Sequence, residues 1–170
     1  MKKFVLAVLI LSLFASPMAF ADTTGVNLDT IRTNCNAARS MLQRIVSSEK
    51  TSRINRGQSY DRTSKLFANF AERLRQNRID NQKFVNLTNE FNSAAANFRS
   101  NYDDYKNSID TVINSECSSR PGDFYNDLTN ARNKRQKVND EIRNLKEITE
   151  RYKSAVSELS KSLYGEKTNE

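Results

Sequence analysis

Apolar residues in the last third of the chain recur at alternating steps of three and four residues, which is the pattern of a heptad stripe on a long helix. The stripe comprises Leu128, Ala131, Arg135, Val138, Ile142, Leu145, Tyr152, Val156, Leu159 and Leu163. Before it, Pro121-Gly122-Asp123 is typical of a turn followed by a helix N-cap, and Gly165 is a C-cap candidate. We therefore expect a helix over residues 124–164.

The middle of the chain repeats this pattern with aromatic residues. Phe84, Phe91, Phe98 and Tyr105 are each seven residues apart, and smaller apolar residues fill the alternate positions. The spacing predicts a second helix over residues 81–116, with Asp80 placed to cap its start. An aromatic stripe at helical spacing indicates a core face rather than an open groove for apolar client segments.

The first third is less regular, with one apolar stripe from Ile31 to Ile45 and another from Tyr60 to Leu74. Between the two stripes the chain is almost entirely polar and contains Gly57, and a glycine inside a helix costs about 1 kcal/mol relative to alanine. We expect a helix over residues 28–78 that is kinked or broken near Gly57.

No segment shows the alternation of a strand bounded by turn residues. The fold class is therefore predicted to be all-α, as an elongated antiparallel coiled-coil-like helical hairpin or a three-helix bundle. Stripes this narrow also leave a seam open to a second copy, so a homo-oligomer is an alternative to a monomer.

The N-terminus has the three parts of a secretory signal peptide. Lys2 and Lys3 precede an apolar run that stops at Pro17, and Ala19-Phe20-Ala21 supplies small residues where a signal peptidase cleaves. We expect residues 1–21 to be removed, residues 22–164 to form one helical domain and residues 165–170 to be a flexible tail. The protein is then exported, to the periplasm or the exterior, and the short leader favours a bacterial source. After cleavage no transmembrane segment is expected.

The two cysteines lie near the start of the first predicted helix and at the end of the second. Antiparallel packing brings Cys35 and Cys117 to the same end of the molecule, although their distances from the turn near Ile79 differ by six residues, about 9 Å of helix rise. An exported chain with two cysteines favours a disulfide within the chain, and free thiols or an intermolecular bridge are the alternatives. The pair lacks the close spacing of redox catalysts.

The chain is moderately basic. Without the signal peptide, 25 basic and 20 acidic residues give a net charge of +5, and the excess lies between residues 22 and 80. Two clusters are candidates for contact with an anionic surface, and both are interrupted by acidic residues as ordinary exposed helices are. The cluster members are Arg53, Arg56, Arg62 and Lys65 in the first, and Arg132, Lys134 and Lys137 in the second.

Arg135 places a charge at a stripe position otherwise held by apolar residues. Polar residues at such positions can fix the register or the partner of a coiled coil. The alternative is that the long side chain reaches out of an open seam to water.

No catalytic site is expected. The chain has no histidine, so the commonest nucleophile and base pairs cannot be assembled. The Ser47 to Lys50 spacing matches Ser-x-x-Lys, but its companion motifs are missing. The carboxylate pairs Asp103-Asp104 and Asp140-Glu141 are neighbours on predicted helices and point about 100 degrees apart, which suits neither a glycosidase nor a metal site. No cofactor, metal or small-molecule substrate is expected.

These features favour an exported, non-enzymatic binding or scaffolding protein of the cell envelope or exterior, whose partner is a protein or an anionic envelope polymer and not nucleic acid. One alternative is a holdase chaperone for exported proteins. In composition and helical content the chain resembles the periplasmic trimeric chaperone that carries outer-membrane proteins, but the strand segments that build that trimer are missing here. A second alternative is a binder of anionic polymers or membrane surfaces.

Overall fold

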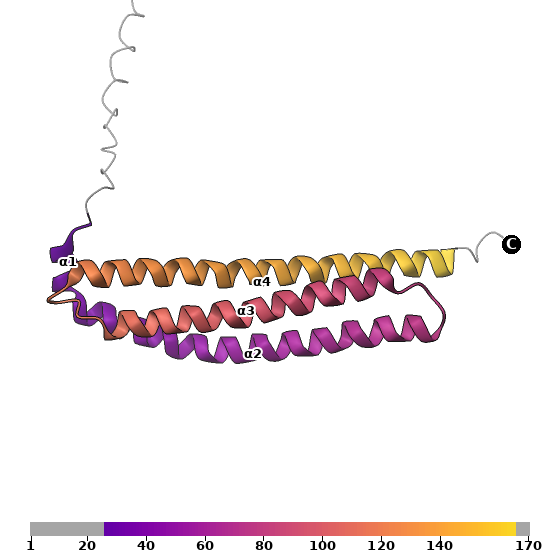
Figure 1. The fold of residues 1–170 in the computed structure, drawn as a ribbon, viewed down its shortest axis with the longest axis horizontal. Helices are drawn as coiled ribbons and strands as arrows, with labels where there is room; N and C mark the ends of the chain where they lie inside the picture. The colour runs from indigo at the N-terminus through magenta and orange to yellow at the C-terminus, as the bar shows by residue number, and fades with distance from the viewer. Residues whose placement is uncertain (1–25, 166–170) are drawn as a thin grey trace, which may run out of the picture.

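The computed structural model describes residues 26–165, and these residues form four helices and no strand (Figure 1). The helices are α1 (Leu28–Thr33), α2 (Cys35–Gln76), α3 (Gln82–Asn114) and α4 (Pro121–Tyr164). The all-α prediction is confirmed. The predicted signal peptide, and the predicted tail apart from Gly165, lie outside the described residues.

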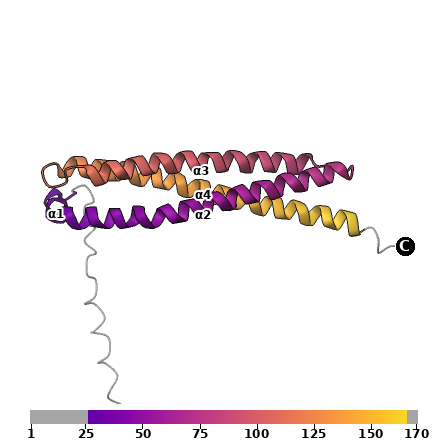
Figure 2. The same cartoon turned by 90° about the horizontal axis from the view of Figure 1, so that it is seen from below.

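The three long helices run up, down and up as an elongated bundle (Figures 1 and 2). At 1.5 Å per residue, the 44 residues of α4 extend about 66 Å. α3 packs against both α2 and α4, and the short α1 packs against α4 at one end. Of the two predicted arrangements, the three-helix bundle is therefore the one observed.

The stripes read from the sequence form one continuous core. The four aromatic residues of the α3 stripe are nearly inaccessible, with exposed fractions between 1% at Phe91 and 4% at Tyr105. On α4, Leu145 and Tyr152 are buried in the same way. The interpretation of the aromatic stripe as core is therefore confirmed.

Tyr152 joins α4 to α2 near the end of the bundle where α2 meets α3. Its ring stacks on Phe67 of α2 with ring centroids 3.6 Å apart. Its hydroxyl donates a hydrogen bond of 3.0 Å to the backbone carbonyl of Phe67. Phe70 and Phe84 pack edge-on against the same ring. One side chain thus connects all three long helices.

The turn between α2 and α3 is a Schellman motif. The amide of Arg78 donates to the carbonyl of Arg75, and the amide of Ile79 donates to the carbonyl of Leu74. Arg78 has φ 58°, the left-handed conformation that glycine usually supplies. Asp80 then accepts a hydrogen bond of 3.0 Å from the amide of Gln82, the first residue of α3, as the sequence predicted.

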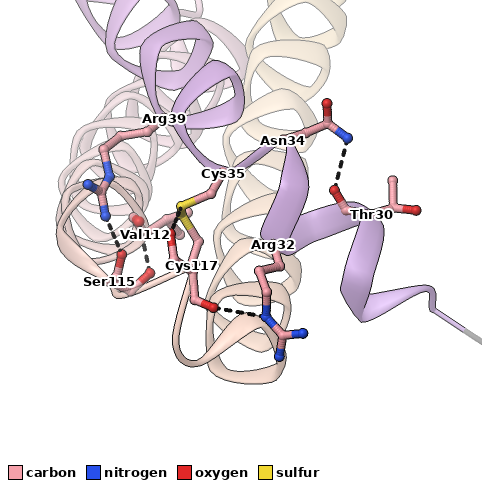
Figure 3. Close-up of a disulfide and its surroundings, with 9 residues drawn as sticks. Thr30, Arg32, Asn34, Cys35, Arg39, Val112, Ser115 and Cys117 are labelled. Carbon is pink, nitrogen blue, oxygen red and sulfur yellow. Dashed lines mark hydrogen bonds between the residues drawn. A yellow bond between two sulfur atoms is a disulfide. The ribbon is translucent and has the colours of Figure 1, made fainter.

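Most helix ends lie within two residues of the prediction, and two differences are larger. α2 continues through Gly57, where a small propensity cost does not outweigh the packing on either side, and the break lies at Asn34 instead. There the Asn34 side chain donates to the carbonyl of Thr30 and the chain turns sharply from α1 into α2 (Figure 3). α4 begins at Pro121 rather than residue 124, because a proline at the first helical position lacks an N–H that would be unpaired anyway.

Candidate functional site

The predicted disulfide between Cys35 and Cys117 is present, with Cα atoms 5.5 Å apart (Figure 3). Both residues are at most 4% exposed. The chain leaves α3 at Ser115 in an extended conformation, which advances farther per residue than helix and so covers part of the six-residue offset. The bond therefore closes one end of the bundle.

Two arginines brace the loop beside the disulfide (Figure 3). Arg39 donates a hydrogen bond of 2.7 Å to the carbonyl of Ser115, and Arg32 donates one of 3.1 Å to the carbonyl of Ser118. The Ser118 hydroxyl lies 3.3 Å from the Cys35 sulfur. These contacts hold the loop that carries Cys117, so the surroundings are those of a structural disulfide.

Basic residues are concentrated on α2. This helix carries nine basic and three acidic residues, a difference of +6. By contrast, α3 has three basic and four acidic residues, and α4 has nine and seven. The positive charge of the helical part of the protein therefore belongs mainly to one helix.

All three acidic residues of α2 are paired with arginines. Glu49 pairs with Arg135 of α4, Asp61 pairs with Arg99 of α3, and Glu72 pairs with a neighbour on α2. The arginine beside Glu72 holds the pKa of that carboxyl at about 2, well below its usual value. None of these three carboxylates is therefore left to offset the unpaired cations of α2.

The structure divides the residues of the first predicted basic cluster. Arg53 already has partners within the protein, because it forms an ion pair of 2.7 Å with Asp103 and lies over the ring of Tyr102. Its other members are exposed and form no ion pair with a described residue; they are Arg56, Arg62 and Lys65. On the same helix, Arg44, Lys50 and Arg73 are also exposed and form no ion pair with a described residue, and the cluster prediction missed them.

The second predicted cluster does not merge with the first. Lys134 lines a groove between α3 and α4 together with Asn107 and Asp127. Arg132 and Lys137 are exposed on α4. The cations of α4 are thus divided between different sides of the helix and alternate with its seven acidic residues.

Arg135 lies at a cleft between α2 and α4 whose floor is formed by Phe98, Tyr102 and Tyr105 of α3. Its guanidinium is 2.9 Å from the Glu49 carboxylate, whose side chain is 19% exposed. The second carboxylate oxygen of Glu49 is buried and has no hydrogen-bond partner among the described residues. Burial, together with Glu49, raises the pKa of Tyr105. Arg135 therefore connects α4 to α2 through an ion pair, and its side chain does not simply extend into solvent.

Replacing Arg135 by alanine is expected to lower the free energy of unfolding by about 1–2 kcal/mol, because the Glu49 carboxylate then loses the one cation with which it pairs among residues 26–165. Glu49→Gln should cost less, since the amide keeps the shape and still accepts a hydrogen bond from Arg135. Chemical denaturation of both variants measures the difference. A loss no larger in Arg135→Ala than in Glu49→Gln would show that the ion pair adds nothing.

Whether Arg135 also sets the register remains a prediction, and an apolar replacement tests it. An Arg135→Leu variant, combined with Glu49→Leu, makes the seam wholly apolar and removes the preference for one register. We expect light scattering to detect higher oligomers in this double variant. An unchanged mass would confine the pair to a stabilising role.

The other candidate chemistry of the sequence does not assemble into a site in the described part of the chain. Asp103 and Asp140 are engaged by Arg53 and Arg143, and Ser47 donates to the carbonyl of Gln43. No group of three metal-ligating side chains lies together among the described residues. Within residues 26–165, no helix is both long and apolar enough to cross a membrane.

Comparison of the chain with protein-family models, with curated proteins and with solved structures finds no match.

Proposed function

We propose that this is an exported, non-enzymatic binding or scaffolding protein of the cell envelope or exterior, which contacts an anionic polymer or surface through α2. The observation that carries the proposal is the charge of α2, where nine basic residues stand against three acidic ones that are all neutralised by arginines. Export rests on the signal-peptide pattern of residues 1–21 and on the disulfide.

Four of the unpaired cations of α2 follow one side of the helix, whereas Lys50 and Arg56 each lie about 120° away from Arg44 around the helix axis. Arg62 lies 18 residues, or five turns, after Arg44, and Arg73 lies about eight turns after it, so the three share a face. Lys65 is one turn beyond Arg62 and close to the same face. The array from Arg44 to Arg73 extends about 44 Å along the rod. A linear array of cations suits a partner with repeated negative charges.

Such an interaction is electrostatic and sensitive to salt. Exposed charges act over about 8–10 Å at physiological ionic strength, so each cation senses only the nearest anions. Cations spaced along a rigid helix therefore add their contributions when the partner is a polymer or a charged surface. A small anion would meet only one of them.

The structure offers less support for the holdase alternative. A holdase needs an apolar surface for unfolded clients, and the aromatic stripe of α3 that would have supplied one is buried. The large apolar side chains exposed on α2, Met41, Ile54 and Leu66, are 12 or 13 residues apart, and the other exposed ones lie near the two ends of the rod. An assay of client aggregation tests this alternative, and suppression at near-stoichiometric amounts would favour it.

Reversing the charge of Arg44, Arg62 and Lys65 to glutamate is expected to reduce binding to an anionic polymer at least tenfold at low salt. The matched control reverses Lys146, Lys153 and Lys161 on α4, which changes the net charge by the same amount. Co-sedimentation with anionic vesicles, and retention on polyglutamate, measure the effect at several salt concentrations. If both variants lose binding equally, net charge alone is responsible and the assignment to α2 is wrong.

A further inference from the structure

The exposed face of α2 carries apolar side chains as well as cations. It points away from the buried residues of the helix, which pack on α3 (Figure 1). Met41 and Leu66 are 58% and 68% exposed, the largest exposed fractions among the large apolar residues of α2. Single exposed apolar residues are common on protein surfaces, so their position relative to the charges decides what they mean.

Both apolar residues lie beside the line of cations. At about 100° per residue, Leu66 is about 40° and Met41 about 60° from Arg44 around the helix axis. Arg62 and Arg73 lie within about 20° of Arg44. Arg44 follows Met41 by three residues, and Arg62 precedes Leu66 by four, so each apolar side chain has a cation one turn away. One face of the helix thus combines positive charge with apolar side chains that extend into solvent.

Negative charge is absent from this face of α2. Each of the three acidic residues of the helix is at least about 80° from Arg44 around the axis and is paired with an arginine. Apart from the three arginines and Lys65, the residues within about 60° of Arg44 are uncharged, and they are exposed. An anionic partner therefore meets no repelling group along the face.

We propose that this face binds the surface of an anionic phospholipid bilayer, with α2 lying parallel to that surface. The inference rests on the proposed contact of α2 with an anionic partner and names the class of that partner. The arginines contact lipid phosphates, while Met41 and Leu66 enter the boundary between headgroups and acyl chains, as the apolar residues of interfacial helices do. Arginine suits this arrangement because its apolar stem covers lipid while the guanidinium stays in the headgroup layer.

A bilayer fits these side chains better than other anionic or apolar partners. A soluble polyanion supplies charge but no apolar phase, so Met41 and Leu66 would remain in water. These two residues are 25 positions apart, about 38 Å along the helix, which is too far for one pocket of a protein client. A bilayer, by contrast, is continuous beneath the whole helix. A second copy packed through the same face would bring like charges together.

Co-sedimentation of the full mature chain with vesicles tests the apolar part of the contact separately from the charge. The vesicles contain phosphatidylglycerol and phosphatidylcholine in equal parts, and polyglutamate serves as a polyanion without lipid. Replacing Met41 and Leu66 together by serine is expected to weaken vesicle binding at least tenfold, because each buried methylene contributes about fourfold. Retention on polyglutamate should change less than twofold, since no charge is altered.

The matched control is Ile54→Ser. Ile54 is 45% exposed on the same helix but lies about 120° from Leu66 around the axis, so it does not share the face. This variant should bind vesicles as the wild type does. Circular dichroism of each variant shows whether it folds, and substitutions at exposed positions should leave the helices intact.

Fluorescence then locates Leu66 relative to the acyl chains. The chain contains no tryptophan, so Leu66→Trp introduces a single reporter. In the presence of the vesicles, its emission should shift to shorter wavelength and should be quenched by lipids that carry bromine on the acyl chains. Ile54→Trp is the control, and its emission should be quenched much less.

The outcomes separate this inference from the function on which it rests. Vesicle binding by the serine double variant equal to that of the wild type overturns the lipid assignment, as does unquenched emission of bound Leu66→Trp. Equal losses on vesicles and on polyglutamate overturn it as well. In each of these cases the contact of α2 with a polyanion still stands. If the wild type binds neither vesicles nor polyglutamate, the proposed function itself is wrong.

Discussion

Replacing both Cys35 and Cys117 by alanine is expected to lower the free energy of unfolding by about 4 kcal/mol. The disulfide closes a loop of 82 residues, and the chain-entropy relation for loops of this length gives about 4–5 kcal/mol. For a chain of this size, such a loss is a large fraction of a typical total stability of about 5–15 kcal/mol. Urea denaturation of the variant and the oxidised wild type measures the difference.

Removal of the disulfide should not destabilise all parts of the bundle equally. Between Cys35 and Phe67, no residue of α2 is fully buried. This half of the helix is held by partly buried side chains such as Leu42 and Val46 and by ion pairs to α3 and α4. Its N-terminal end therefore depends on the disulfide more than α3 and α4 do.

Hydrogen exchange of the backbone amides tests this expectation residue by residue. In the alanine variant, amides of residues 35–57 should lose protection first, while those of α3 and α4 keep theirs. Reduced wild-type protein is the control and should behave as the variant does, since both lack the bond. A uniform loss of protection across all helices would contradict the idea that the disulfide mainly anchors α2.

The sequence was sufficient for the fold because long helices with heptad stripes leave few alternatives. Three helical segments separated by two turn regions predicted three antiparallel helices, and antiparallel packing then brought Cys35 next to Cys117. The position of the break in the first helix was wrong because propensity at Gly57 is a local cost of about 1 kcal/mol. The pairing geometry of the disulfide is a tertiary constraint, and the break occurs beside it at Asn34.

The partners of the charged residues could not be predicted in the same way. The sequence placed Arg53 among exposed cations, but its pairing with Asp103 depends on how α2 and α3 are aligned, 50 residues apart in the chain. Glu49 was not identified as the partner of Arg135 for the same reason.

Replacing Tyr152 by alanine is expected to cost about 3–5 kcal/mol, the range for removing a large aromatic side chain from a core. Tyr152 is 4% exposed, and the substitution removes its stack on Phe67 and its edge contacts with Phe70 and Phe84. The matched control is Tyr164→Ala, the same change on the same helix at a residue that is 70% exposed. The control should alter the free energy of unfolding by no more than about 0.5 kcal/mol.

Tyr152→Phe separates the hydroxyl from the ring. It keeps the stack but removes the hydrogen bond to the carbonyl of Phe67, and should cost about 1 kcal/mol at neutral pH. A loss as large as that of the alanine variant would mean that the hydrogen bond, and not the ring, connects α4 to α2.

Because of the same hydroxyl, we expect the stability of the protein to depend on pH in the alkaline range. Burial raises the pKa of Tyr152 to about 12, whereas an unfolded tyrosine titrates near about 10. The folded state therefore keeps its proton after the unfolded state has lost it, so stability is complete below about pH 10 and falls as pH rises toward about 12. Burial also raises the pKa of Tyr102 and Tyr105. These two residues therefore add to the alkaline loss of stability in the wild type and in Tyr152→Phe alike.

Denaturation measured at steps between about pH 9 and about pH 12 isolates the contribution of Tyr152. Because phenylalanine does not titrate, the free energy of unfolding of Tyr152→Phe should fall less steeply over this interval than that of the wild type. The two curves should therefore converge as the pH rises. Parallel curves would show that the Tyr152 hydroxyl ionises alike in the folded and unfolded chains, and hence that it is not held in the buried contact with Phe67.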